Sequence, residues 1–487
     1  MTTKTTTKSA AFPRAANTTT TPTTKTNGRQ KWFLLCLSVV ECLLCTGVTF
    51  GLSALTISLK RDGQFAETCF RGAEEGATIL MPEGEGEEEC VGQKLKFNAM
   101  FTAGTVSVPL SMMFWGRVID LKGVKWVRLV SLSLFTVGCA LFAESDSKTF
   151  DAYVVSCVFL GSGGAGFFIS HFQFCEHWRH TMYFGMSHSA MNMAFDSSTV
   201  TFYAFEAMHK AGCSVRALFY GLAGLSAVFM MSTNNYVWGK YLDPPEKEEY
   251  VEEAEMESGG DGELAKVQSS RAKGLEHLGV PLTQMKFTEQ VRTPYFISVA
   301  AWSLGSIYRS MFILGSIFEQ MLYNGDGRST KDANAYVRVF NALILVSTFL
   351  TPFFGFFVDR FGLAPAFTLV NVLGVISFVG VLWNHDIVSL SIAFLAFGCF
   401  RAWNYSCLTI YVQGVFGNAT FGQLYGIGIG VFAVISGAMQ YPSMHLILKE
   451  GDGSFLVVDL LMICIGILLF AFPVWIRKNG VVGAHGS

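Results

Sequence analysis

Twelve stretches of apolar residues run along the chain, separated by polar segments. Each is near the roughly 20 residues with which a helix crosses the hydrocarbon core of a bilayer, about 30 Å thick. Backbone polar groups cannot stay unpaired in lipid, so each stretch is expected to be a helix. The pattern therefore predicts an all-α membrane protein with twelve transmembrane helices. The stretches are 33–59, 96–118, 127–143, 151–173, 183–206, 213–233, 294–318, 335–358, 363–384, 387–411, 421–447 and 454–476.

Polar segments divide the predicted helices into two sets of six. Residues 1–31 are Thr-rich and basic and have no apolar core, which predicts a disordered cytosolic tail and not a cleavable signal. Residues 236–292 are acidic and bear Gly and Ser, which is typical of a solvated linker. The expected plan is an N-terminal six-helix bundle over 32–235, a cytosolic linker over 236–292 and a C-terminal six-helix bundle over 293–478.

Composition and charge agree with a chain that lies in a membrane. Charged residues make up 15% of the chain, against roughly 25% in ordinary soluble domains. The net charge of -2 gives no long-range field to attract nucleic acid, so that partner is excluded. Most of the 35 Lys and Arg residues, Arg128 among them, fall in segments on the side of the N-terminal tail. The positive-inside rule then places both termini in the cytosol, and we expect the plasma membrane rather than a vacuolar membrane.

The twelve cysteines lie almost all inside apolar stretches, where they are interpreted as small buried hydrophobic residues. We expect no metal site and no cofactor. Cys69 and Cys90 differ, because both lie in the acidic loop 60–94 on the outer side. An oxidising exterior favours a disulfide between them.

An internal repeat follows the second and the eighth predicted helices. Both positions fit the pattern G-x-x-x-D-x-x-G, and two matches at corresponding helix ends indicate two halves related as parallel repeats. The motif residues are Gly116, Asp120, Lys122 and Gly123 in the first half, and Gly355, Asp359, Arg360 and Gly362 in the second.

In these motifs the chain resembles the major facilitator superfamily, whose signature loop follows its second helix. The resemblance implies that Asp120 lies against a helix N-terminus of the other half, where exposed N–H groups and the helix dipole favour an anion. Leu121 stands where a basic residue is usual, and Leu363 and Ala364 replace the basic ending in the second half. A weak network of ion pairs between the halves is therefore expected.

Longer stretches resemble solute carrier family 43 of this superfamily, the Na⁺-independent amino acid facilitators and nucleobase carriers. The resemblance implies a uniporter that moves neutral, large amino acids by facilitated diffusion and rocker-switch alternating access. Purine nucleobases are the alternative substrate that it implies. The stretches are Glu41–Gly47, Gly51–Lys60, Ala194–Thr199, Arg309–Gly315, Phe400–Tyr405 and Phe421–Gly426.

Four charged residues are predicted at bilayer depth: Glu41, Asp196, Arg309 and Arg401. Each costs about 2.5–3.5 kcal/mol on insertion scales, so each is a candidate for function. A pair between Glu41 and Arg309, on the first and seventh helices, would neutralise both. Such a pair would either contact substrate or only hold the bundles shut.

Arg401 leads a helical face on which Asn404 and Tyr405 follow three and four residues later. A guanidinium beside an amide and a phenol can hold a carboxylate, the headgroup of an α-amino acid. The same three residues could hold a nucleobase edge, or the arginine could bind helix-end carbonyls.

The fifth predicted helix carries a polar stripe. Such a stripe cannot face lipid, so it lines either other helices or a central cavity. Asp196 is a candidate for binding a substrate amine, and we expect the polar side chains of both halves to meet in one wet chamber near the bilayer centre. The stripe consists of His188, Asn192, Asp196, Thr199 and Tyr203.

The expected partners are a small-molecule substrate and the lipid bilayer, and the chain is expected to be a monomer. An enzyme is not expected, because no HExxH motif, paired catalytic aspartates or Ser/His arrangement lies at bilayer depth, and no catalytic residue is assigned. The alternative to a transporter is a nutrient receptor of the same fold that moves nothing.

Overall fold

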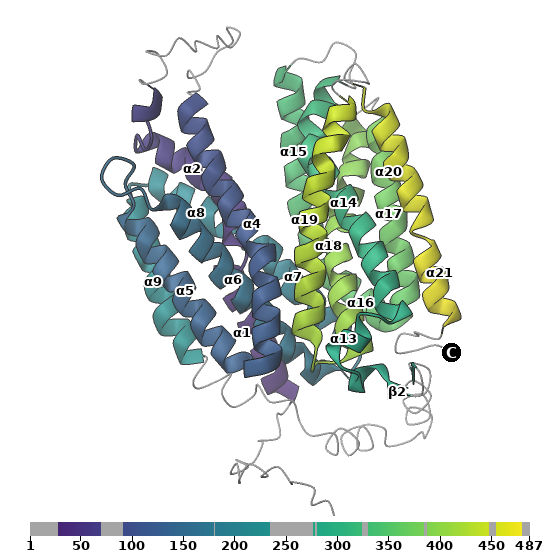
Figure 1. Ribbon diagram of the computed structural model, residues 1–487. Helices are drawn as coiled ribbons and strands as arrows, with labels where there is room; N and C mark the ends of the chain where they lie inside the picture. The colour runs from purple at the N-terminus through teal and green to yellow at the C-terminus, as the bar shows by residue number, and fades with distance from the viewer. Residues whose placement is uncertain are drawn as a thin grey trace, which may run out of the picture.

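The computed structural model describes residues 28–69, 91–179, 181–233, 276–277, 280–323, 330–383, 387–447 and 454–479. These residues form two helical bundles that lie side by side (Figure 1).

The N-terminal bundle has six spans, four of which are broken or extended by a short helix. The spans are α1 (Gly28–Cys45) with η1 (Val48–Gly51) and α2 (Leu52–Arg61); α4 (Val91–Lys122); α5 (Val124–Glu144); α6 (Tyr153–Cys175) with η2 (Glu176–Trp178); α7 (Phe184–Ser197) with α8 (Val200–Lys210); and α9 (Val215–Leu225) with η3 (Ser226–Met230). Helix α1 begins before the expected start of the bundle, because its polar first turn extends the helix beyond the apolar stretch.

The C-terminal bundle repeats this plan with six further spans. They are α14 (Pro294–Tyr323), α15 (Thr330–Phe349) with α16 (Thr351–Phe361), α17 (Leu363–Trp383), α18 (Ile387–Phe416), α19 (Phe421–His445), and α20 (Leu456–Leu468) with α21 (Ala471–Lys478).

The predicted twelve-helix membrane fold is confirmed. Seven spans are each long and apolar enough to cross a bilayer. Two bent spans also qualify when their parts are taken together: the first consists of α1, η1 and α2, and the second of α15 and α16. The remaining three spans are α4, α7 with α8, and α9 with η3.

The breaks in the first and fifth spans pack against each other. A Cβ atom on Gly47 would lie 2.5 Å from the carbonyl oxygen of Phe195, and one on Gly51 would lie 2.6 Å from that of Thr199. Only glycine permits this approach of two backbones. The fifth span is therefore held against the first at its break.

The end of the expected linker packs on the C-terminal bundle. Strands β1 (Glu276–His277) and β2 (Val280–Pro281) precede η5 (Leu282–Gln284) and α13 (Phe287–Gln290). The Gln290 amide donates to the carbonyl of Phe416, at 3.3 Å, and Thr420 donates to Gln290 Oε1, at 2.7 Å. This segment is thus fixed to the turn between α18 and α19.

The expected burial of the cysteines holds for seven of the ten free cysteines and is wrong for three. Cys69 is disulfide-bonded, while its expected partner Cys90 lies outside the described residues, so the pairing stays a prediction. Of the free cysteines, Cys36, Cys213 and Cys464 are exposed and the others are buried.

The two bundles touch near one end of the molecule and diverge toward the other, where α2 and α15 lie (Figure 1). Helix α4 crosses α19 at glycines: a Cβ on Gly116 would overlap the carbonyl oxygen of Gly422, and one on Gly426 would overlap that of Met112. Helix α7 crosses α16 in the same way, with Gly185 against Gly355. Both crossings lie beside the repeated motifs, so the motif end is the closed end.

Candidate functional site

The polar stripe of α7 forms a row of contacts with α18 of the other bundle. His188 Nε2 bonds to Oε1 of Gln413, and one turn further along α7 the Asn192 amide donates to Thr409 Oγ1, at 3.3 Å. The Gln413 amide also donates to the carbonyl of Phe172, at 3.1 Å. His188 and Asn192 are buried. In this conformation they hold the bundles together.

The next residue of the stripe, Asp196, meets Arg401 across the two bundles. Arg401 Nη2 lies 3.1 Å from Asp196 Oδ2, and the side chains are 19% and 14% exposed. Beyond this pair Thr199 is half-buried and Tyr203 is 56% exposed. The ion pair therefore stands where the contact between the bundles ends and exposure begins.

Polar groups beside this pair have unused hydrogen-bonding capacity. Among the described residues, Arg401 Nε and Asn404 Oδ1 have no hydrogen-bond partner. The pair itself is a single N···O contact and not a bidentate one. An incoming charged or polar group could thus bind here without first breaking a saturated network.

Two phenols lie near the Asp196–Arg401 pair, and a phenylalanine precedes Asp196 in the chain. Phe195, next to Asp196 in the chain, has its ring centroid 4.4 Å from that of Phe168. Tyr405 and Tyr425 lie within electrostatic range of Asp196. Aromatic residues of both bundles are thus found near the ion pair.

The motif aspartates form two matching contacts at the closed end. Asp120 accepts hydrogen bonds from the N–H groups of Gly422 and Gln423 at the start of α19, at 3.1 and 2.8 Å. Asp359 accepts from those of Gly185 and Met186 at the start of α7, at 2.6 and 2.9 Å. Each carboxylate caps a helix N-terminus of the other bundle, where the dipole favours it. We call these two contacts the latches.

The remaining motif residues play simpler parts. Gly123 and Gly362 have φ values of 84° and 87°, which glycine adopts without strain, and they turn the chain between consecutive spans. Lys122 and Arg360 are exposed. A further contact beside the latches joins Arg179 to the carbonyl oxygen of Gly414, at 3.1 Å.

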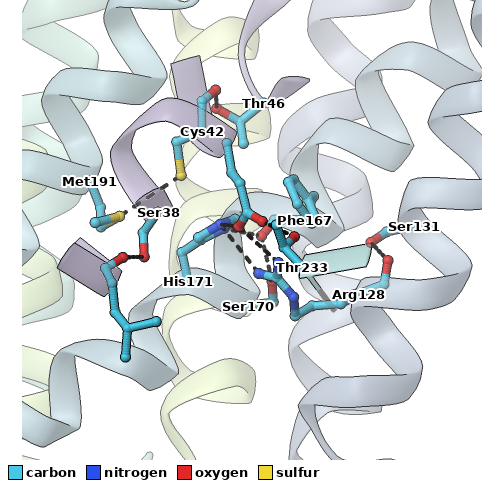
Figure 2. A network of polar contacts seen from close by, with 12 residues as sticks. Ser38, Cys42, Thr46, Arg128, Ser131, Phe167, Ser170, His171, Met191 and Thr233 are labelled. Atoms are coloured by element: carbon cyan, nitrogen blue, oxygen red, sulfur yellow. Dashed lines mark hydrogen bonds and ion pairs between the residues drawn. The ribbon is translucent and has the colours of Figure 1, made fainter. Parts of the chain in front are cut away.

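The expected pair of Glu41 with Arg309 is wrong, because Glu41 is neutralised inside its own bundle. Glu41 Oε2 lies 2.8 Å from Arg128 Nη2 and 2.9 Å from His171 Nε2, and Thr233 donates to Oε1. Figure 2 shows Arg128, His171 and Thr233 converging from α5, α6 and the end of the sixth span. Glu41, Arg128 and His171 are 0% exposed. We call this the N-bundle charge cluster.

The assignment of Arg128 to a cytosolic segment was also wrong. Arg128 lies in the first turns of α5 and its guanidinium sits 4.5 Å from the ring centroid of Phe167. The sequence placed it beside Lys122 and Lys125, at the start of an apolar stretch, and gave no sign of a buried counter-ion. Its partner Glu41 is 87 residues away in the chain.

Arg309 lies in the interior of the C-terminal bundle, away from Asp196 and Arg401. Its guanidinium is 0% exposed and stands 5.1 Å from the ring centroids of both Phe378 and Phe400. The four expected charges therefore do not meet in one chamber: only Asp196 and Arg401 come together across the bundles.

Gln413 and Thr409 were missed by the sequence analysis, although they complete the row on α18. With Arg401 they recur at intervals of four and eight residues, a helical stripe that faces the stripe of α7. That spacing was the available signal. Thr409 and Gln413 carry no charge, so neither has the insertion cost that marks the four charged candidates.

Comparison with known proteins places these features in a family context. The family model of the Major Facilitator Superfamily matches residues 88–438. The Equilibrative nucleobase transporter 1 of Bos taurus is 23% identical over 486 residues, covering 91% of this chain and 95% of that protein. The Aromatic and large neutral amino acid transporter 5-3 of Toxoplasma gondii is 23% identical, covering 97% of this chain and 88% of that protein.

Solved structures share the fold. A double Trp mutant of XylE has a TM-score of 0.59 at 14% identity and covers 93% of this chain and 96% of its own. The human organic anion transporter MFSD10 has a TM-score of 0.56 at 13% identity, covering 91% and 99%. At these identities the likeness concerns the arrangement of helices alone.

Proposed function

This chain belongs to the Major Facilitator Superfamily, and from that premise we propose that it is a transporter of large neutral amino acids. The proposed mode is Na⁺-independent facilitated diffusion through alternating access. The proposal includes cytosolic termini in the plasma membrane, so that the latches close the cytosolic side and the described conformation opens to the outside.

The observation that carries the proposal is the Asp196–Arg401 ion pair. An α-amino acid bears an ammonium and a carboxylate, the complement of these two side chains. The substrate ammonium would bind Asp196, and its carboxylate would bind the free edge of Arg401, with Asn404 nearby. The tyrosines near the pair, Tyr405 and Tyr425, favour a substrate with a large uncharged side chain.

The position of the pair links binding to movement. Asp196 belongs to one bundle and Arg401 to the other. A substrate that replaces their direct contact with two contacts of its own joins the bundles through itself. Its binding energy can then favour the conformations in which both bundles reach it, the requirement for carrying a substrate across the membrane.

A purine nucleobase is the second candidate substrate. The similarity to the Equilibrative nucleobase transporter 1 over 91% of this chain supports it, and Arg401 with Asn404 could bind a base edge. A nucleobase lacks the separated opposite charges that the ion pair complements, so we rank it second.

The experiment is uptake by the purified protein in liposomes. We expect labelled leucine to enter, with little competition from adenine and no dependence on Na⁺. Arg401→Lys should raise the half-saturation concentration about tenfold or more, because a lysine ammonium cannot bind a carboxylate in a bidentate manner. Arg216→Lys is the matched control, since Arg216 is exposed and pairs with Glu144 inside the N-terminal bundle.

Three results would contradict the proposal. Adenine uptake that leucine does not inhibit would favour the nucleobase carrier. An unchanged half-saturation concentration in Arg401→Lys would remove this residue from substrate recognition. Binding of leucine without counterflow would favour a receptor.

A further inference from the structure

Two buried charges of opposite sign in the C-terminal bundle lack partners. Arg309 on α14 and Asp459 on α20 are both 0% exposed. All three guanidinium nitrogens of Arg309 and both carboxylate oxygens of Asp459 have no hydrogen-bond partner among the described residues. Buried charges are strongly disfavoured unless they are paired, so this arrangement calls for a second state in which they are.

The Arg309 guanidinium lies between two phenylalanine rings and two glycines, which we call its aromatic box. The rings of Phe378 and Phe400 stand on it at 5.1 Å each. A Cβ on Gly374 would lie 3.0 Å from Nη1, and one on Gly466 would lie 2.6 Å from Nη2. Two cation–π contacts hold the group in place but do not neutralise its charge.

Asp459 faces the same interface as Gly466. Buried residues of α20 include Asp459, Met462 and Gly466, whose spacings of three and seven residues place them on one helical face. Gly466 touches Arg309. Asp459 therefore lies on the face of α20 that is turned toward Arg309, two turns from Gly466.

The register between α14 and α20 places Asp459 within reach. The helices are the first and sixth of a bundle whose spans alternate in direction, and a Cβ on Gly305 would lie 3.2–3.4 Å from Leu469 and Ile465. Arg309 is then level with about residue 463, and Asp459 lies about one turn, or 6 Å, beyond it along α20. An arginine side chain spans this distance by changing its rotamers.

Other charges do not compete for this role. Helices α14, α17 and α20 carry Arg309, Glu319 and Asp459 as their only Lys, Arg, Asp or Glu residues. Glu319 is partly exposed, and Arg401 on α18 is engaged by Asp196. In the described part of the bundle, Asp459 is the one buried counter-charge that Arg309 can reach.

We propose that Asp459 is a further residue of the transport cycle, the counter-ion that Arg309 binds when the bundles part at the latches. In the latched state the Arg309 guanidinium lies between Phe378 and Phe400 beside Gly466, and in the opposite state it moves about two turns along α20 to the Asp459 carboxylate. Helix α14 can convey the movement, because Tyr308, next to Arg309, bonds to Ser443 on α19, the helix that one latch holds. The inference rests on the alternating access of the proposed function.

A structure of the opposite conformation tests the proposal on the native pair. The double variant Asp120→Asn and Asp359→Asn weakens both latches and leaves Arg309 and Asp459 unchanged. We expect electron cryomicroscopy of this variant in lipid nanodiscs to show the guanidinium within about 4 Å of the Asp459 carboxylate. A guanidinium that stays between Phe378 and Phe400 after the bundles have parted would overturn the proposal, whatever the substrate.

Exchange kinetics give a second test. Arg309→Gln and Asp459→Asn should each slow leucine counterflow about tenfold, with unchanged half-saturation, and the double variant should be no slower than either, because both remove one interaction. Glu319→Gln on α14 is the control and should match the wild type. Single effects that multiply to about a hundredfold, or wild-type exchange in Asp459→Asn, would contradict the pair. A shifted half-saturation in Arg401→Lys tests the substrate site separately.

Discussion

Each bundle buries an arginine in its interior, and the two bundles balance that charge differently. In each, a guanidinium lies over a phenylalanine of the fourth helix of that half: Arg128 over Phe167, and Arg309 over Phe400. In the N-terminal bundle Glu41 neutralises the arginine at 2.8 Å, whereas the described residues offer Arg309 two aromatic rings and no hydrogen-bond partner. The comparison teaches that a shared fold fixes where a buried charge can sit but not how it is balanced.

The difference assigns different parts to the bundles. The N-bundle charge cluster joins four spans. Because its charges are already paired, we expect the N-terminal bundle to move as a rigid body. Among the described residues of the C-terminal bundle, Arg309 and Asp459 have no hydrogen-bond partner, and their pairing would favour a rearrangement of its interior. We therefore expect most internal change during transport to occur in α14 and its neighbours.

The largest expected difference in stability is between a variant of Glu41 in the N-terminal bundle and a variant of Arg309 in the C-terminal bundle. Glu41→Gln leaves Arg128 buried without a counter-ion and should destabilise the protein by about 3–5 kcal/mol. Arg309→Gln removes a charge that has no hydrogen-bond partner among the described residues, so its cost in stability should be smaller. Thermal unfolding of both variants in detergent compares them. Equal decreases in Tm would show that the two arginines are balanced alike.

Glycine substitutions at the crossing of the bundles come next. Gly422→Ala puts a methyl group against Gly116 and Asp120, and overpacking of this kind costs about 1–3 kcal/mol. It should open the closed end. Gly437→Ala on the same helix has nothing within 4 Å and serves as control.

Spin labels at Lys125 and Thr368, two exposed positions near the motif ends of α5 and α17, would report this opening as a longer distance. An unchanged distance in Gly422→Ala would mean that the bundles are not held at this crossing.

Removing the rings should produce a smaller difference. Phe400→Leu deletes one of the two groups that hold Arg309, whereas Arg128 keeps Glu41 when Phe167 is replaced by Leu. We expect Phe400→Leu to be the more destabilising of the two by about 1 kcal/mol. The free energies of unfolding in a denaturant series measure it. A larger loss of stability in Phe167→Leu would show that Arg128 depends more on its aromatic contact than Arg309 does.

The smallest expected effect concerns the latches, where we expect the two bundles to behave alike. Asp120 and Asp359 each accept two backbone hydrogen bonds from a helix N-terminus. Asp120→Asn and Asp359→Asn should each weaken the closed state by about 1 kcal/mol and to the same extent. The labels at Lys125 and Thr368 would show equal shifts. Unequal shifts would extend the asymmetry of the bundles from their interiors to their interface.

Local patterns let the sequence predict the helices and the stripe of α7, because both depend on periodicity within one segment. Partners were another matter. Glu41 contacts Arg128, His171 and Thr233 from three other spans. Contacts between different spans cannot be predicted from the residue spacing within one helix. Asp459 was not noticed, because a single acid near the end of an apolar stretch resembles an interfacial residue. Only the packing of α20 on α14 makes it conspicuous.

Analogues of phenylalanine test most directly whether the substrate bridges Asp196 and Arg401 with its two charges. Competition against labelled leucine would be measured with phenylalanine, with phenethylamine, which lacks the carboxylate, and with 3-phenylpropionate, which lacks the ammonium. We predict that phenylalanine competes and that each analogue competes at least about tenfold less well. Equal competition by either analogue would show that one of the two charges is not recognised, and the account would fail.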